Sequence, residues 1–140
     1  TKGAIPVLEK GISFHTQRHR VITSNLANVN TPYYQARDLP VRQFYNFLNR
    51  AVDSRRAEGG NPRRFEFRPW GDVSTNAHGS PRFRTVPSGD VNQLRHDGNN
   101  VDIDMEMSKL ARNTLMHNTL VGLLNNQFQM IGQAISGRVI

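Results

Sequence analysis

Residues 103–135 read IDMEMSKLARNTLMHNTLVGLLNNQFQMIGQAI. A mostly apolar seam recurs in this stretch at alternating steps of four and three: Ile103, Met107, Leu110, Thr114, His117, Val121, Leu124, Phe128, Ile131 and Ile135. This spacing is typical of helices that pack along one another. Asp102 and Asp104 suit the start of a helix, where the dipole favours acids, and Gly137 follows its end. The stretch therefore predicts a helix of about 34 residues, roughly 50 Å long.

The same spacing returns near the other end of the chain, within residues 4–29. The seam there consists of Leu8, Ile12, His15, His19, Ile22, Leu26 and Val29. Pro32 ends this helix, because a proline disfavours helical geometry at the residue before it. We predict that the two helices pair as a coiled-coil-like hairpin.

Both helices carry a second apolar line beside the seam. It comprises Phe14 and Val21 in the first helix and Met116, Leu120, Leu123, Met130 and Ala134 in the second. One hairpin cannot bury both lines, so the second lines are expected to face outward and to mark an interface with neighbouring subunits. The predicted seam and interface residues are Leu8, Ile12, Ile22, Leu26, Leu110, Leu120, Val121, Leu123, Leu124, Phe128, Ile131 and Ile135.

The middle of the chain has a different character. Residues 41–52 predict a short helix, whereas residues 53–100 are rich in glycine, proline and asparagine, which break long elements. The alternating stretches 65–68 and 83–86 leave two alternatives open, a short β-ribbon or an irregular loop. The expected fold is mainly α, a single domain made of three segments: helix and extended turn in 1–40, short helix and irregular or β insertion in 41–100, and the long helix in 101–140.

Composition excludes several classes of function. The chain has 140 residues, a net charge of +7 and no cysteine, so disulfide and thiolate chemistry are absent. No apolar run is long enough to span a membrane, and the first twenty residues lack the apolar core of a signal peptide. No P-loop, GxGxxG, HExxH or nucleophile-elbow motif is present. We expect neither an enzyme nor a cofactor.

Basic and aromatic residues interleave in the middle segment. They are Arg55, Arg56, Arg63, Arg64, Arg68, Arg82 and Arg84, with Phe65, Phe67, Trp70 and Phe83. Such a pattern can track a nucleic-acid backbone and stack bases, so a single-stranded nucleic-acid-binding protein is the alternative from a different class. A solvated basic ribbon that contacts neighbouring subunits is favoured, because no recognised nucleic-acid motif accompanies the charge.

Three histidines fall on seam positions: His15, His19 and His117. His15 and His19 are one helical turn apart, as metal-binding pairs often are. A polar layer that fixes the register of the two helices is the favoured interpretation, and no metal is expected.

The end of the first helix carries the most specific motif, Ser24-Asn25-Leu26-Ala27-Asn28-Val29-Asn30-Thr31-Pro32-Tyr33-Tyr34-Gln35-Ala36. It resembles the SNxANxxTPGY signature of the flagellar axial proteins, the rod, hook and hook-associated proteins. Tyr33 stands where that family often has glycine; if the turn needs a positive φ, a tyrosine meets a steric cost that glycine avoids. The candidate assembly residues are Ser24, Asn25, Ala27, Asn28, Thr31, Pro32 and Tyr34, with Asn25 and Asn28 expected to cross-link adjacent chains through their amides.

Residues 97–113 and the ending Ala134-Ile135-Ser136-Gly137-Arg138 resemble the proximal rod members of the same family. The resemblance implies a structural subunit of the torque-transmitting rod at the base of the flagellum. It implies assembly with its own copies and other rod proteins, and contacts with the adaptor protein FliE, the MS ring and the export gate. It also implies a periplasmic position in the basal body, export by the flagellar type III system without a cleaved signal peptide, no nucleic acid and no direct membrane insertion. Another rod protein of the family is the alternative within this class.

Overall fold

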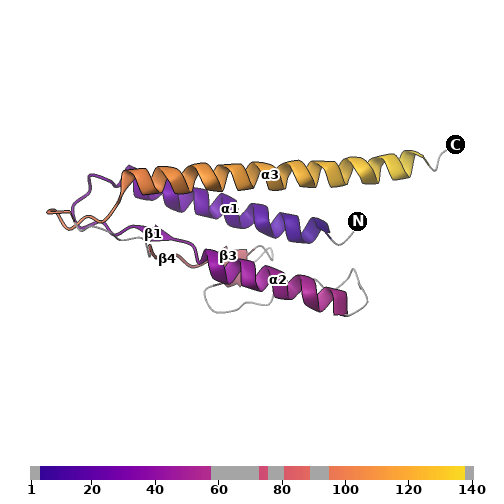
Figure 1. Ribbon diagram of the computed structural model, residues 1–140, viewed down its shortest axis with the longest axis horizontal. Helices are drawn as coiled ribbons and strands as arrows, with labels where there is room; N and C mark the ends of the chain where they lie inside the picture. The colour runs from indigo at the N-terminus through magenta and orange to yellow at the C-terminus, as the bar shows by residue number, and fades with distance from the viewer. Residues whose placement is uncertain (1–3, 58–72, 76–80, 89–94, 138–140) are drawn as a thin grey trace.

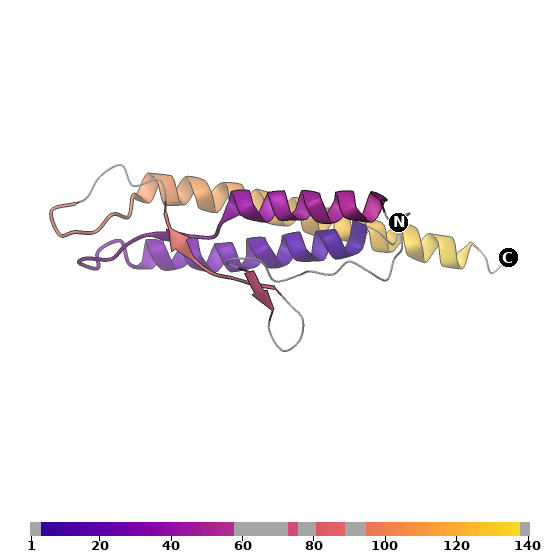
Figure 2. The same ribbon diagram turned by 90° about the horizontal axis from the view of Figure 1, so that it is seen from below.

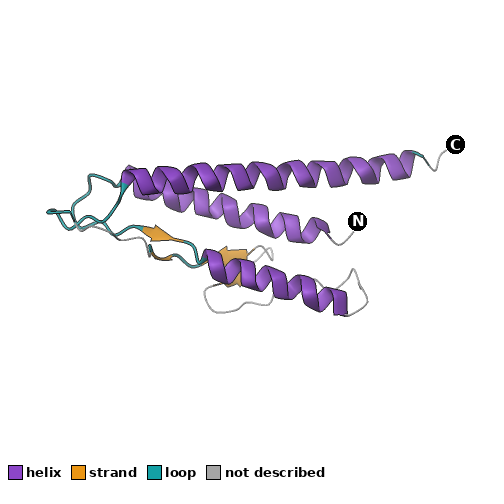
Figure 3. Ribbon diagram, viewed as in Figure 1, coloured by secondary structure: helices purple, strands orange, loops and turns teal. Residues whose placement is uncertain are grey.

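The computed structural model describes residues 4–57, 73–75, 81–88 and 95–137. Helices α1 (Ala4–Ala27) and α3 (Ile103–Ser136) come from the two ends of the chain, and α2 (Val41–Ala57) follows α1. Short strands lie between α1 and α3 in the sequence: β1 (Arg37–Asp38), β2 (Val73–Thr75), β3 (Pro81–Phe83) and β4 (Val86–Pro87). Figure 3 shows the predominance of helix, which confirms the predicted mainly α fold.

The ends of α3 agree with the sequence signals. Asp102 is the N-cap residue, and its carboxylate accepts a hydrogen bond from the backbone N–H of Met105 at 3.1 Å. Asp104 and Glu106 lie in the first turn, where the helix dipole favours negative charge. Gly137 caps the other end, donating its N–H to the carbonyl of Gln133. The helix has the 34 residues that the sequence predicts.

Helices α1 and α3 form the predicted antiparallel hairpin, as Figure 1 shows. Asn25, near the end of α1, meets Glu106, near the start of α3. Further along, Gly11 lies against Leu120, where a Cβ on the glycine would come within 3.0 Å of the leucine side chain. Continued in this register, Ala4 lies level with Gln127, so residues 128–136 of α3 run on past the described start of α1. Among the described residues, no helix has the length and apolarity that crossing a membrane requires.

One of the two predicted lines of the α3 seam is correct, and the other is rotated by one residue. Leu110, His117, Leu124 and Ile131 are half-buried as expected, and so is Val121. The second line is Glu106, Asn113, Leu120 and Gln127, which are buried or half-buried, whereas Ile103, Met107, Thr114, Phe128 and Ile135 are exposed. Phe128 and Ile135 lie past the described start of α1, so no described residue of that helix faces them and their place in the seam stays a prediction. The sequence pattern misplaced this line because three of its four true members are polar.

On α1, the predicted seam residue Ile22 is fully buried, and Leu8, Ile12 and Leu26 are half-buried. Phe14, predicted to face outward, is instead fully buried.

The apolar core lies on the side of α1 away from α3. Phe14 stacks on Phe44 of α2, with ring centroids 4.0 Å apart, and meets the edge of Phe83 at 5.0 Å. Leu39 completes the buried cluster, with Val21 half-buried beside it. Helix α2 runs alongside α1 in both views (Figures 1 and 2), and this contact explains why Phe14 does not face solvent.

Two antiparallel ribbons tie the middle of the chain to α1. Strand β1 pairs with β4, and β2 pairs with β3. Gln17 of α1 binds the backbone of β3. Its side-chain amide donates to the carbonyl of Pro81 at 2.7 Å and accepts from the N–H of Phe83 at 3.2 Å. The predicted strand 83–86 is thus divided between the two ribbons, and the predicted strand 65–68 lies outside the described residues.

Phe14→Ala is expected to lower the free energy of unfolding by about 3–5 kcal/mol, because it removes a fully buried ring from the only apolar cluster found in the described residues. Leu115→Ala, at a position 70% exposed on α3, is the matched control and should change it by less than about 0.5 kcal/mol. Urea unfolding followed by circular dichroism measures both values. Equal losses in the two variants would contradict the assignment of the core.

Candidate assembly site

The signature stretch forms a tight turn directly after α1. The backbone N–H of Thr31 donates to the carbonyl of Asn28 at 3.0 Å, and its hydroxyl donates to the Asn28 side chain at 3.1 Å. The N–H of Tyr34 then donates to the carbonyl of Thr31 at 3.3 Å. Pro32 and Tyr33 thus occupy the centre of a four-residue turn. Tyr33 has a φ of 59°, and proline followed by a positive φ is the pattern of a type II turn.

The steric cost expected at Tyr33 is therefore present. Among the described residues it is the one non-glycine residue with positive φ, a conformation that costs about 1–2 kcal/mol for a residue with a Cβ. The turn is held by the neighbouring loop, since the N–H of Tyr33 donates to the carbonyl of Asp97 at 3.0 Å. The tyrosine ring lies on Gly98, where a Cβ would come within 2.8 Å of it. The close contact exists because position 98 has no side chain.

Asn99, in the same loop as Asp97 and Gly98, donates hydrogen bonds to the backbone that follows α1. Its side chain is fully buried, and its amide N–H groups point at three backbone carbonyls that follow the end of α1: Asn28 at 3.0 Å, Val29 at 3.1 Å and Thr31 at 2.8 Å. Its Oδ1 accepts from the N–H of Val101 at 2.7 Å. Sequence reasoning missed this residue, because the carbonyls it meets lie about 70 positions earlier.

Asn25 is the centre of the arrangement. It is fully buried, and its amide donates to Glu106 Oε2 at 2.8 Å and to the carbonyl of Arg37 at 2.6 Å. Its Oδ1 accepts from the Tyr34 hydroxyl at 3.2 Å and from the N–H of Arg37 at 3.1 Å. Both donors and both acceptor positions of one side chain are therefore used. Asn25 joins α1, the signature turn, β1 and α3.

The buried carboxylate of Glu106 has a second partner. Lys109, one turn further along α3, places Nζ 3.0 Å from Glu106 Oε1 and donates to the Ser88 hydroxyl at 2.8 Å. The N–H of Ser88 donates to the carbonyl of Ala36, which extends the network to the residue before β1. A buried ion pair of this kind is tolerated only when its remaining polar atoms are satisfied, and Asn25 and Ser88 satisfy them.

A second polar group lies further along the hairpin. Asn113 of α3 donates its amide to the carbonyl of His15 at 2.9 Å, which fixes the orientation of the amide and leaves Oδ1 facing His15 Nδ1 at 2.7 Å. Nδ1 must therefore carry the proton. Nε2 is left to accept from the Tyr45 hydroxyl at 3.2 Å. His15 thus links all three helices as a neutral imidazole.

The protonation states of this group follow from burial. Desolvation lowers the pKa of His15 below its usual value, although the hydrogen bond that the ring donates to Asn113 opposes this, and the charges of Arg18 and His117 lower the pKa further. Burial raises the pKa of Tyr45, so its hydroxyl keeps the proton that it donates. Of the three histidines predicted to form a polar layer in the seam, His15 belongs to this group, whereas His19 is exposed.

Several proteins of known role are similar in sequence to this chain over most of its length. The chain is 32% identical over 135 residues to the "Flagellar basal body rod protein FlgB" of Bacillus subtilis, covering 96% of this chain and 95% of that protein. It is 32% identical over 121 residues to the protein of that name from Cereibacter sphaeroides, covering 86% and 84%. The Yersinia enterocolitica protein of that name is 30% identical over 137 residues, covering 91% and 89%. No family model matches the chain.

The chain belongs to the FlgB family of flagellar basal body rod proteins.

It is accordingly a structural subunit of the flagellar rod, in the basal body, which assembles with other rod components. The nucleic-acid-binding alternative has no support, and Phe83, one of the aromatic residues that suggested it, is buried against Phe14 and Phe44. The remaining aromatic residues of that pattern lie outside the described residues.

In this FlgB-family chain, some signature residues bond within the subunit and others are exposed. Asn25 makes all its hydrogen bonds inside the subunit, and the amide of Asn28 donates to the carbonyl of Ser24 at 2.8 Å. The expectation that these amides cross-link adjacent chains is therefore wrong for Asn25, whose amide is fully used within its own chain, and it stays a prediction for Asn28. Tyr34 is half-buried, whereas the outward residues of the motif are Ser24, Ala27, Thr31 and Pro32.

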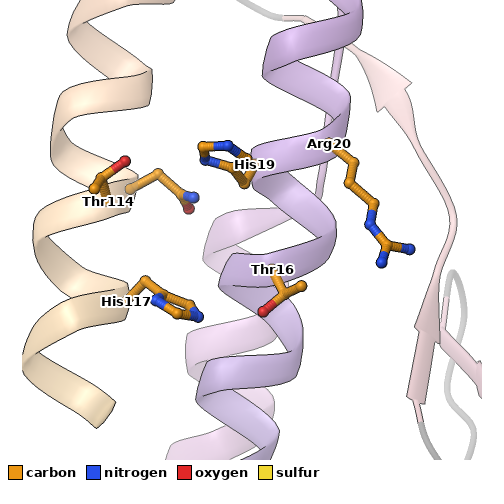
Figure 4. Close-up of a pocket in the computed structure, with 6 residues that line it drawn as sticks. Thr16, His19, Arg20, Thr114 and His117 are labelled. Carbon is orange, nitrogen blue, oxygen red and sulfur yellow. The ribbon is translucent and has the colours of Figure 1, made fainter. Parts of the chain in front are cut away.

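The three seam histidines do not gather into one site. His15 turns both ring nitrogens to Asn113 and Tyr45, while His19 and His117 line a pocket of about 290 Å³ between α1 and α3. Figure 4 shows these two rings entering the pocket from opposite helices. Within the residues that the structure describes, no group of three or more metal-ligating side chains occurs.

Asn25→Ala is expected to destabilise the subunit by about 3 kcal/mol, because it leaves the buried Glu106 Oε2 and the half-buried Tyr34 hydroxyl without their partner. Asn30→Ala, an exposed position in the same turn, is the control and should be neutral. Denaturant unfolding measures the loss, and hydrogen exchange should show faster opening of residues 28–37. Equal stability of the two variants would refute the central role of Asn25.

Stability is expected to fall as the pH drops from 7.5 to 5. The pKa of His15 is lower in the folded chain than its value of 6.5 in the unfolded chain, so the unfolded state takes up the proton first. The contribution is complete above pH 6.5 and is lost below it, by up to about 1.4 kcal/mol per unit of pKa separation.

Unfolding at several pH values should show this decrease in the unsubstituted chain and in His19→Gln, which leaves the His15 contacts intact. In His15→Gln the decrease should be smaller. An identical pH profile in His15→Gln would show that His15 is not its source.

Proposed function

We propose that this chain is a subunit of the proximal part of the rod, where it transmits torque from the motor towards the hook. The proposal rests on the likeness of residues 97–113 and 134–138 to proximal rod proteins and on the name of its relatives. The role is mechanical rather than catalytic. Rigid helices locked in register by buried polar contacts suit a part that must transmit torque without shearing.

The proposed partners are further copies of the chain, the other rod proteins, the adaptor protein FliE, the MS ring and the export gate. The proposed place of assembly is the periplasmic space, reached through the flagellar type III system without a cleaved signal peptide. These proposals derive from the resemblance of residues 24–36 to the axial-protein signature. The three segments 1–40, 41–100 and 101–140 would act there as one domain.

The exposed apolar surface of α3 is the observation that carries the assembly role. The exposed large apolar residues of this helix are Ile103, Met107, Leu115, Met116, Leu123, Phe128, Met130 and Ile135. So many large apolar side chains exposed on one helix are unusual in water, and such surface usually marks an interface. We therefore assign Leu123, Phe128 and Ile135 to contacts between subunits and Leu120, Val121 and Leu124 to the hairpin.

Leu123→Asp is expected to leave the fold intact and to abolish incorporation into the rod, because it places a charge on a half-exposed interface residue. Asn118→Asp, an exposed polar position on the same helix, introduces the same charge and should keep both properties. Circular dichroism of the purified variants tests the fold, and motility with isolation of basal bodies tests incorporation. Motile cells carrying Leu123→Asp would contradict the assignment.

A further inference from the structure

Two hollows adjoin on the surface of α1. The first is the pocket of about 290 Å³ between α1 and α3, and the second, of about 520 Å³, lies between α1 and strand β3. Thr16 and Arg20 line both hollows, and these two residues are one helical turn apart on the same face of α1. The hollows therefore form one depression across α1, which is called the basic groove below.

Basic side chains come from each of the three elements that enclose the groove. His117 belongs to α3, His19 and Arg20 to α1, and Arg82 to β3. Figure 4 shows His19 on the side of α1 that faces α3 and Arg20 directed away from α3. No lining residue in the described part of the chain is an Asp or a Glu. Among the described residues, no carboxylate forms an ion pair with Arg20 or Arg82.

The carboxylate of Asp38 does not offset this positive charge. Asp38 directly precedes Leu39, which lines the groove, but both of its carboxylate oxygens accept hydrogen bonds from Arg18 at 2.8 Å. This bidentate pair is already neutral, so Asp38 is not free to pair with Arg20 or Arg82. The groove therefore carries an excess of positive charge that a partner of opposite charge would balance.

The floor of the second hollow is apolar. Leu39 and Phe83 are buried core residues, and Val21 is half-buried beside them. A chain lying in this hollow would cover the apolar floor and exclude water from the arginines, and charge pairs are stronger there than on an open surface. An arginine can also bind a carboxylate through two parallel hydrogen bonds. The groove thus suits a protein segment in which carboxylates flank an apolar side chain.

The net charge of the chain indicates which protein supplies this segment. Each copy carries a net charge of +7, so two copies repel one another, and the acidic segment is expected from a different protein. The two hollows also have the size of pockets that hold many atoms, larger than one small anion fills.

We propose that the basic groove binds an acidic segment of a different rod component, with Arg20 and Arg82 pairing with its carboxylates. The inference rests on the assembly of this chain with other rod components. It adds the surface that makes the contact and the chemistry of the partner.

Reversing the charge of the groove tests the proposal. Cells of the source bacterium lacking their own copy would express the full chain with Arg20→Glu and Arg82→Glu, and incorporation into isolated basal bodies should fall at least about tenfold, because like charges then meet. The control is Arg42→Glu with Arg112→Glu, which changes the charge equally at exposed positions outside the groove and should incorporate normally. Circular dichroism of both purified variants should match the unsubstituted chain. Normal incorporation of the groove variant, or an equal loss in the control, overturns the proposal.

Photo-crosslinking identifies the occupant without disturbing the fold. Arg82, which is exposed at the groove, is replaced by the photoreactive amino acid p-benzoylphenylalanine, and assembled basal bodies are irradiated. Mass spectrometry should find it joined to a segment of a different rod component with several Asp or Glu residues close together.

The other outcomes of this experiment are equally decisive. Cross-links to a second copy or to a segment without carboxylates, or no cross-link in basal bodies that contain the variant, overturn the groove as the contact and leave the rod assignment standing. Failure of the unsubstituted chain to enter basal bodies overturns the proposed function and this inference together.

Discussion

The fold depends on the buried contact between the Asn25 amide and the Glu106 carboxylate. A carboxylate that is 2% exposed must be met by donors, and Asn25 from α1 and Lys109 from α3 supply them. Slippage of α1 along α3 would leave Glu106 Oε2 without its donor in a buried place, at a cost of about 1–3 kcal/mol. The contact therefore fixes the register of the hairpin, and Asn25 also holds β1 and the signature turn in place.

This constraint determines where the apolar residues go. Because Glu106, Asn113 and Gln127 fill one inner line of α3, several large apolar residues of this helix remain exposed, Met107, Leu115 and Leu123 among them. The apolar core of the subunit does not lie between α1 and α3. It lies where Phe14 of α1 packs against Phe44 and Phe83. Polar contacts thus specify the pairing of the long helices, while much of their apolar surface remains available to neighbours.

The predictable parts of this fold are those that local signals determine. The heptad spacing predicts both terminal helices. Pro32 indicates that α1 ends before it, and Asp102 indicates where α3 starts. The rotation of α3 was not predictable, because a pattern of apolar residues gives no weight to Glu106 or Asn113. Their partners Asn25 and His15 lie 81 and 98 positions away. The hydrogen bonds of Asn99 were also not predictable, because the carbonyls that it meets are distant in the sequence. The positive φ of Tyr33 was predictable, because the family often has glycine at that position.

The turn of residues 30–34 also shows how strain and rigidity coexist. A tyrosine in left-handed conformation persists because its surroundings fix the turn. Asn99 holds backbone carbonyls that precede the tyrosine, the carbonyl of Asp97 accepts its N–H, and Gly98 leaves room for its ring. Each of these contacts also restricts the motion of the turn. Loss of any one of them would let the strained backbone relax, so the left-handed geometry of Tyr33 and the rigidity of this part of the subunit come from the same contacts.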